Sequence, residues 1–278
     1  MAGLLEQYYE IEAEGIDYHI DLISGAYRMD NIHRARVGIK KIKAVHRLLG
    51  SSFPVKSDTK ILNNRYKSVF RPLGRYREIN NTILLLRKFR GSGKLRKPYS
   101  EFQYAELLKL RSDIDSAIEA YNRTRDSISY DAVFSQLRIS SFEEEIGIIK
   151  AFVSKETGKA RCLLDKAKNP GELHAIRIAL KNIKPFLRLL YPLKKTGFKS
   201  RHYRLLNRTE SLLGKWHDRQ ILRESLELFI KDIDDTSTRL SCQRIISRIA
   251  MKEELKFPVI LKRTNNCLQA LEHLSTEG

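Results

Sequence analysis

The chain has 278 residues, of which 42% are hydrophobic, and it carries 52 Lys/Arg against 33 Asp/Glu. This length can bury a core in one large or two small domains, and the apolar content excludes a disordered chain. A formal net charge of +19 indicates an acidic partner without identifying it.

No apolar run reaches the length of about 18 residues that a membrane helix needs. Four glutamates stand among the first 14 residues, where a secretory signal would have basic and then apolar residues. The three cysteines, Cys162, Cys242 and Cys267, are widely spaced and odd in number, which fits a reducing compartment and excludes a Cys-rich metal site. We therefore expect a soluble, cytoplasmic protein without a metal or other cofactor.

The hydrophobic periodicity is helical along nearly the whole chain, and the alternation and hairpin turns typical of strands are missing. We expect helices over 4–24, 31–49, 58–71, 73–90, 100–126, 142–167, 171–191, 198–213, 215–232, 236–252 and 257–274. Asp30 or Asn31 can cap the second helix, and Asn169-Pro170 is typical of a cap followed by the first helical residue. The expected fold class is all-α.

The expected helix 31–49 carries a stripe of five cationic or titratable side chains. At relative positions 0, 3, 7, 10 and 14 stand His33, Arg36, Lys40, Lys43 and Arg47. Residues three, four and seven apart share one face of an α-helix, so the stripe is roughly 80° wide. The opposite face is apolar and consists of Ile32, Ala35, Ile39, Ile42 and Leu49. Because like charges repel, such a stripe favours an anionic partner lying along it.

The same pattern recurs 141 residues later, in the expected helix 171–191. Its members are His174, Arg177, Lys181, Lys184 and Arg188, opposite an apolar face of Ile176, Leu180, Ile183, Leu187 and Leu190. Pro185 stands inside this helix, where the first copy has Ala44. A proline deletes the hydrogen bond to the carbonyl four residues earlier, so we expect a kink that keeps the two copies from superposing perfectly.

A second correspondence follows each stripe. The segment LGRYRE, from Leu73, matches LGKWHD, from Leu213, at a shift of 140 residues. Two motifs at nearly the same shift indicate a duplicated unit of about 140 residues within a single domain over 1–278, with a first half, 1–140, and a second half, 141–278. Duplicated helical units associate about a pseudo-twofold axis, by analogy with symmetric dimers. The two basic helices would then line one central cleft.

The positive charge is concentrated around the two stripes. Residues 31–77 hold 13 Lys/Arg and one acid, and residues 173–209 hold 10 Lys/Arg and no acid. The remainder of the chain, with 29 basic and 32 acidic residues, is slightly acidic. A merely solvated surface would mix both signs, so the segregation indicates a function that uses cations.

The motifs resemble those of the CHAD family, whose name stands for conserved histidine α-helical domain. The resemblance rests on HRARV from His33 with Lys40 and Lys43, on HAIRI from His174 with Lys181 and Lys184, and on the two Leu-Gly segments. It implies two pseudo-symmetric four-helix bundles around a basic cleft that binds inorganic polyphosphate without catalysis. It also implies association with polyphosphate granules in the cytoplasm. The second copy departs from the pattern at two positions. The family often has Arg or Lys where this chain has Asn182, and typically has Arg where this chain has His217.

Polyphosphate requires many cations at regular intervals on rigid elements. Arg36 and Arg177 suit forked hydrogen bonds to phosphate oxygens, and the lysines of both stripes supply point charges further along. His33 and His174 lie near the expected helix starts, where free backbone N–H groups also favour an anion. Outer contacts are expected from Lys67, Arg71 and Arg75 in the first half and from Arg201, Arg204, Arg208 and Lys215 in the second.

Two other functions remain open from the residues alone. The first is binding of RNA or another nucleic acid, because a basic groove does not by itself distinguish phosphodiesters from polyphosphate. The stripes carry no interleaved aromatics for base stacking, which disfavours it. The second is a metal-dependent phosphohydrolase using His217 and Asp218, which the scarcity of acids in the basic windows disfavours. We therefore expect no enzymatic activity and no membrane partner, and the sequence does not indicate an oligomeric state.

Overall fold

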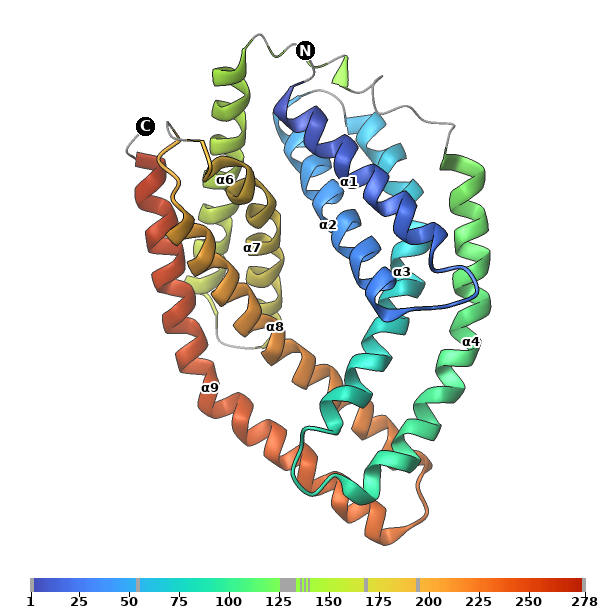
Figure 1. Cartoon of the computed structure of the whole chain (residues 1–278). Coiled ribbons are helices and arrows are strands. Elements are labelled where there is room, and N and C mark those ends of the chain that lie inside the picture. The colour runs from blue at the N-terminus through green and yellow to red at the C-terminus, as the bar shows by residue number, and fades with distance from the viewer. Residues whose placement is uncertain are drawn as a thin grey trace.

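The computed structural model describes residues 3–53, 56–125, 134–135, 137, 139, 141–167, 170–193 and 196–276. These residues form α-helices and one short 3-10 helix, with no strand among them, which confirms the all-α fold (Figure 1). The elements are α1 (Leu4–Asp21), α2 (Met29–Ser52), α3 (Lys56–Leu86), α4 (Gly93–Arg125), α6 (Phe142–Asp165), α7 (Pro170–Leu190), α8 (Ser200–Phe229), η1 (Ile230–Asp232) and α9 (Thr236–Thr276).

Three expected helix boundaries are wrong, because the helices run through them. α3 passes Pro72, α8 passes Gly214, and α9 runs through residues 253–256, which the sequence predicts to separate two helices. A proline removes one backbone hydrogen bond and a glycine costs conformational entropy, but a long helix that packs an apolar face on both sides of that residue remains continuous. α7 also continues through Pro185 to its end at Leu190.

The second helix begins earlier than its expected caps. α2 starts at Met29, so Asp30 and Asn31 lie in its first turn and do not cap it. The Asp30 carboxylate instead forms an ion pair with Arg34 at 2.9 Å. Pro170 is the first residue of α7, as expected, whereas the expected cap at Asn169 lies outside the described residues.

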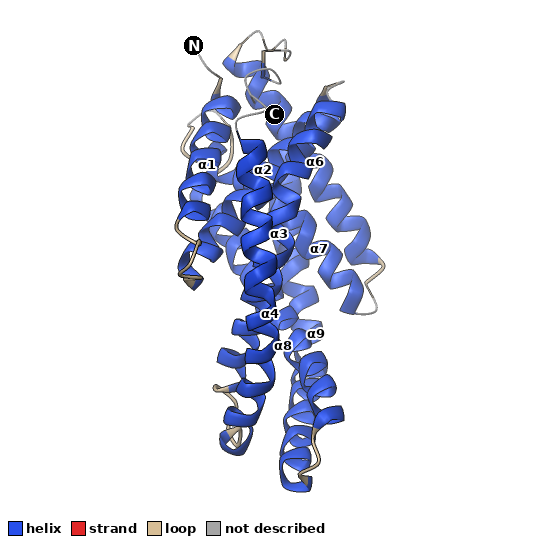
Figure 2. Cartoon of the chain, turned by 90° about the vertical axis from the view of Figure 1, so that its right-hand side faces the viewer, coloured by secondary structure: helices blue, strands red, loops and turns tan. Residues whose placement is uncertain are grey.

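The helices form two groups of four, with α1–α4 in the first half and α6–α9 in the second (Figure 1). Within each half the consecutive pairs pack together: α1 on α2, α3 on α4, α6 on α7 and α8 on α9. Figure 2 shows the helices running along the long axis of the molecule. The halves meet where α2 contacts α7 and α3 contacts α8. The two basic stripes therefore lie on the helices that form the joint.

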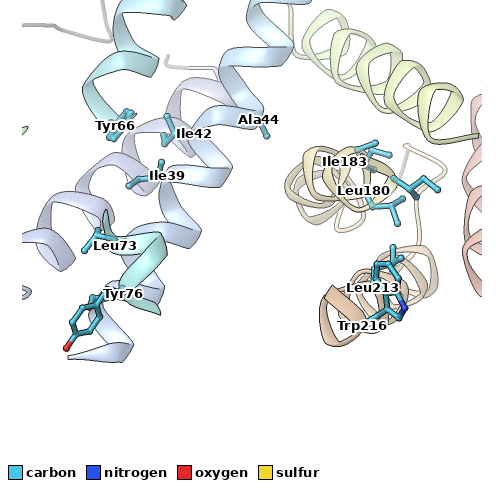
Figure 3. Close-up of a cluster of buried hydrophobic side chains, with 14 of the residues drawn as sticks. Ile39, Ile42, Ala44, Tyr66, Leu73, Tyr76, Leu180, Ile183, Leu213 and Trp216 are labelled. Atoms are coloured by element: carbon cyan, nitrogen blue, oxygen red, sulfur yellow. The ribbon is translucent and has the colours of Figure 1, made fainter. Parts of the chain in front are cut away.

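The buried apolar side chains form one core cluster, to which the two halves contribute residues at the repeat shift (Figure 3). The matched pairs are Ile39 with Leu180, Ile42 with Ile183, Leu73 with Leu213 and Tyr76 with Trp216. Tyr76 is the most exposed of these side chains, at 6%. The apolar faces expected on α2 and α7 are also buried. Because the stripes lie opposite these apolar faces, packing of the apolar faces into the core turns both stripes toward the joint.

A buried carboxylate ties the first half to the second at one end of the molecule. Glu145 of α6 accepts hydrogen bonds from the backbone N–H groups of Leu4, at 2.8 Å, and Leu5, at 2.6 Å. The free N–H groups at the start of α1 are thereby satisfied by a side chain from the other half.

Candidate functional site

A basic cavity lies between the two halves. Its larger part, of about 420 Å³, is lined by α2, α3, α7 and α8. A smaller part, of about 100 Å³, lies toward α3 and α8. Four residues line both parts and show that they adjoin: Lys40, Arg77, Arg177 and Lys181. The cavity therefore gathers cations from both repeated helices.

The structure brings seven of the ten stripe residues to this cavity and leaves three beside it. The seven are His33, Arg36, Lys40, Arg177, Lys181, Lys184 and Arg188. Lys43 lies over the ring of Phe70, Arg47 is exposed, and His174 contacts the ring of His217 at a centroid distance of 4.6 Å. Because His217 lines the smaller part of the cavity, His174 is one side chain removed from it.

The early start of α2 changes the environment expected for His33. Ile32 N–H already donates to the Arg28 carbonyl within the helix, at 3.1 Å, so the free backbone donors lie before His33. Any contact of His33 with an anion therefore uses the ring nitrogens of its imidazole and not the free backbone N–H groups at the start of α2. Partial burial, Arg77 and Lys40 lower the pKa of His33, and burial and Arg177 lower the pKa of His174.

The expected outer contacts do not form a continuation of the cavity. Arg201, Arg204 and Arg208 line a separate cavity of about 610 Å³ between α8 and α9. Lys67, Arg71 and Lys215 are exposed, and Arg75 forms an ion pair with Glu78 at 2.8 Å. Lys67 and Arg71 are close enough to contribute to the lowered pKa of Lys43. Their part in binding stays a prediction.

The paired glycines let an arginine from each stripe approach the backbone of the neighbouring helix. A Cβ atom added at Gly74 would stand 2.5 Å from Nη1 of Arg36, and one added at Gly214 would stand 3.3 Å from Nη2 of Arg177. Nη1 of Arg36 also donates a hydrogen bond to the carbonyl of Phe70. The Leu-Gly motif is therefore a packing position for the arginine of its own half, and α3 and α8 continue through it.

The cations of the joint are held close together and partly away from water. Burial and then Lys181 lower the pKa of Lys40 to about 6, and burial and then Arg177 lower the pKa of Lys181 to about 8. Burial and then Arg77 lower the pKa of Arg36. Both the loss of hydration and the like charges destabilise the charged forms, so a bound anion would stabilise them.

Arg77 is a site residue that the sequence reasoning missed. It lines both parts of the cavity, and it acts on the pKa values of His33, Arg36 and Lys40 in the first half and of Arg177 and Lys181 in the second. Its counterpart at the repeat shift is His217. Burial and then Arg177 lower the pKa of His217 to about 4, so this imidazole is neutral at pH 7.

Glu210 is the second missed residue, and it is an acid within the basic cavity. Its carboxylate lies 3.3 Å from Nζ of Lys184, and 3.9 Å from both Nε of Arg177 and Nζ of Lys181. Burial raises the pKa of Glu210, but Lys184 and Lys181 outweigh burial and hold the pKa below its ordinary value. The carboxylate is therefore ionised and neutralises part of the second stripe.

The departure at Asn182 concerns packing within each half. Its counterpart, Lys41, forms an ion pair with Glu12 of α1 at 2.5 Å. Asn182 donates a hydrogen bond to Glu156 of α6 at 2.6 Å. Each side chain therefore contacts an acid on the first helix of its own half, and the exchange removes no unpaired cation from the cavity.

Among the described residues, no three His, Cys, Asp or Glu side chains are grouped so that they could hold a metal ion. None of the helices that the described residues form combines the length and the apolar character that a membrane span requires.

The fold and the cavity together define an all-helical protein in which two groups of four helices enclose a basic site at their joint. The sequence model of the CHAD domain family matches residues 13–227, and the chain therefore belongs to the CHAD family. The crystal structure of the CHAD domain from the plant Ricinus communis superposes with a TM-score of 0.76 at 16% identity, covering 97% of this chain and 92% of that one. That likeness shows a shared fold. The comparison with curated proteins returned no match.

Proposed function

We propose that this chain binds inorganic polyphosphate, without catalysis, in the cavity at the joint. The observation that carries the proposal is the meeting of Arg36 and Lys40 from α2 with Arg177 and Lys181 from α7 around one cavity. The charges of these side chains are costly in the absence of an anion, because they are partly desolvated and lie near one another.

A bare phosphate chain fits the chemistry of this lining. The guanidinium groups can form two parallel hydrogen bonds to phosphate oxygens, and the ammonium groups can balance charge at successive phosphates. Among the described residues that line the two parts of the cavity, Tyr203 is the one Phe, Tyr or Trp, beside the imidazoles of His33 and His217. Single-stranded nucleic acids bind through several stacked bases, so this lining favours polyphosphate over RNA.

A competition titration tests the proposal. Labelled long-chain polyphosphate is bound to the protein at physiological salt and displaced with unlabelled polyphosphate, tRNA or duplex DNA at equal phosphate concentration. We expect polyphosphate to compete more than about tenfold better than either nucleic acid, because the cavity supplies cations and little stacking surface. Equal or better competition by tRNA would assign the cavity to RNA binding. A labelled protein that remains diffuse in cells containing polyphosphate granules would contradict the granule association that goes with this function.

A further inference from the structure

Three cations occupy equivalent positions in the two halves, but the residue that they contact differs. In the first half, Arg36, Lys40 and Lys43 surround the ring of Phe70, with the charged atoms 4.1, 6.0 and 4.0 Å from its centroid. An aromatic face attracts cations without neutralising them. No carboxylate of the described chain forms an ion pair with any of the three. Within the described chain, no carboxylate therefore competes with a ligand for these three side chains, and a bound anion would favour the charged form of Lys40, whose pKa is lowered in the free protein.

In the second half the equivalent cations surround a carboxylate. Arg177, Lys181 and Lys184 are the counterparts of Arg36, Lys40 and Lys43, and all three form ion pairs with Glu210. The side chains of Glu210 and Arg177 are both 15% exposed, so water screens this contact only in part.

Phe70 and Glu210 occupy the same position in the two halves. Each stands four residues before the glycine that packs on the arginine of its stripe, Gly74 or Gly214. One helical turn therefore separates the arginine contact from the residue that differs. The exchange of Phe70 for Glu210 changes the residue beside the cations, and the contact between the arginine and the glycine is kept in both halves.

Three other exchanges on the same helices also remove positive charge from the second half. Arg77 corresponds to His217, Lys67 to Asn207 and Arg71 to Ser211. Arg77 lies in the cavity, and Lys67 and Arg71 lie near Lys43. Together with Glu210, these exchanges remove positive charge from the second half, whereas its additional cations Arg204 and Arg208, at the positions of Asn64 and Ser68, line a separate cavity.

We propose, on the basis of polyphosphate binding, that the first-half cations form the primary binding surface and that Glu210 is an internal counter-anion that competes with the ligand for the second-half cations. A phosphate group reaches Arg177, Lys181 and Lys184 by displacing the Glu210 carboxylate from them. Glu210 thereby lowers affinity and sets the unequal contribution of two similar stripes.

The Glu210→Gln variant tests the counter-anion, because the amide keeps the size of the side chain and removes its charge. We expect polyphosphate to bind about threefold to tenfold more tightly, as a partly screened ion pair is lost from the competition. The matched control is Glu106→Gln, which removes an exposed acid that pairs with Lys109 on α4, away from the cavity. It makes the same change in net charge, and we expect a change of less than about twofold.

Paired arginine variants test the inequality of the halves. We expect Arg36→Gln to weaken binding about tenfold or more, which is the loss of a hydrogen bond to a charged group. Arg177→Gln should weaken binding about threefold or less in the natural chain and about tenfold in the Glu210→Gln background, where no carboxylate competes. Circular dichroism on every variant shows whether the helices persist, and variants that keep the natural spectrum are compared.

The outcomes separate this inference from the function on which it rests. Equal losses for Arg36→Gln and Arg177→Gln in both backgrounds, with unchanged affinity for Glu210→Gln, would overturn the counter-anion while polyphosphate binding stands. A natural chain and a Glu210→Gln variant that both fail to bind polyphosphate would overturn both.

Discussion

The first and second halves of this protein share a cationic stripe, a glycine contact and matched core positions, yet they differ at the residue that the stripe surrounds. In the first half three cations lie against the ring of Phe70, and in the second their counterparts lie against the carboxylate of Glu210. The repeated motif therefore determines the positions of the cations. A residue on the neighbouring helix determines whether a carboxylate of the protein already neutralises part of their charge.

The most severe way to break this comparison is to reverse the arginine of both halves. In the Arg36→Glu, Arg177→Glu variant each carboxylate faces the remaining cations and repels phosphate, so we expect polyphosphate affinity to fall about a hundredfold or more. The measurement is the Kd, with circular dichroism to show that the helices persist.

The matched control for that double reversal is Arg87→Glu with Lys256→Glu, two exposed cations, one directly after α3 and one on α9, that do not line the cavity. It makes the same change in net charge. A similar loss of affinity in both double variants would show that binding follows total charge, and the assignment of the cavity would be wrong.

Alanine at each glycine sharpens the comparison by displacing one arginine at a time. A Cβ at Gly74 would lie 2.5 and 2.9 Å from Nη1 and Cζ of Arg36, whereas a Cβ at Gly214 meets Arg177 no closer than 3.3 Å. We expect Gly74→Ala to weaken polyphosphate binding about tenfold and Gly214→Ala about twofold, because a displaced guanidinium loses its hydrogen-bonding position. Both variants gain helix propensity, so a weaker affinity with an unchanged or higher Tm supports displacement. Equal affinities in the two variants would contradict it.

The pH dependence of binding reports on the lysines of the joint. The pKa of Lys40 is about 6 and that of Lys181 about 8 in the free protein, and a bound anion raises both, so binding takes up protons between pH 6 and 9. Affinity should therefore increase as the pH falls through this range, by at most about tenfold per pH unit for each proton taken up. Calorimetry in two buffers of different ionisation enthalpy measures the uptake. At pH 7 the uptake should fall in Lys40→Met and stay nearly unchanged in Lys181→Met, with the remainder coming from His33 and His174, whose pKa values a bound anion also raises. Unchanged uptake in both variants would contradict this assignment.

The smallest effects concern the stability of the free protein. The pKa of Lys40 is lower in the folded chain than in the unfolded chain, so the unfolded state binds more protons between about pH 6 and pH 10, and stability rises with pH there. Lys40→Met removes this cost and should raise the free energy of unfolding at pH 7 by about 1 kcal/mol. Lys181→Met should raise it less, because the ion pair with Glu210 already stabilises the charge of Lys181. Denaturant unfolding without ligand measures both, and a lower stability for Lys40→Met would contradict the prediction.

The repeated elements of the fold and site could be predicted because they leave periodic patterns on a single helix. The apolar faces of α2 and α7, from Ile32 to Leu190, are buried as their spacing predicts. The stripes lie opposite these faces, and most of their members line the cavity. The family resemblance, carried by the same residues, is confirmed by the match over residues 13–227.

The missed residues are those whose role depends on a neighbouring helix. Glu210 stands one position beyond the acid-free window of residues 173–209, and no pattern on α8 shows that it meets α7. Aligning the residues before Gly74 and Gly214 would have placed it opposite Phe70 and exposed the difference. Arg77 lies beyond the stripe of α2, and its counterpart at the repeat shift is His217, so the repeat does not single it out as a cation of the site. The helix boundaries at Pro72 and Gly214 failed for a related reason, since packing on both sides outweighs the local penalty.

Lys40 has a consequence for how sequences of this kind change over time. A lysine that lowers the stability of its own fold is retained only where its ligand compensates for that cost. In a lineage whose cells no longer make the ligand, mutations of this lysine to an apolar residue would be favoured, since they improve folding and lose nothing. A relative with methionine or leucine at this position, and with its apolar faces intact, would then be a descendant that kept the architecture after its original role had ended.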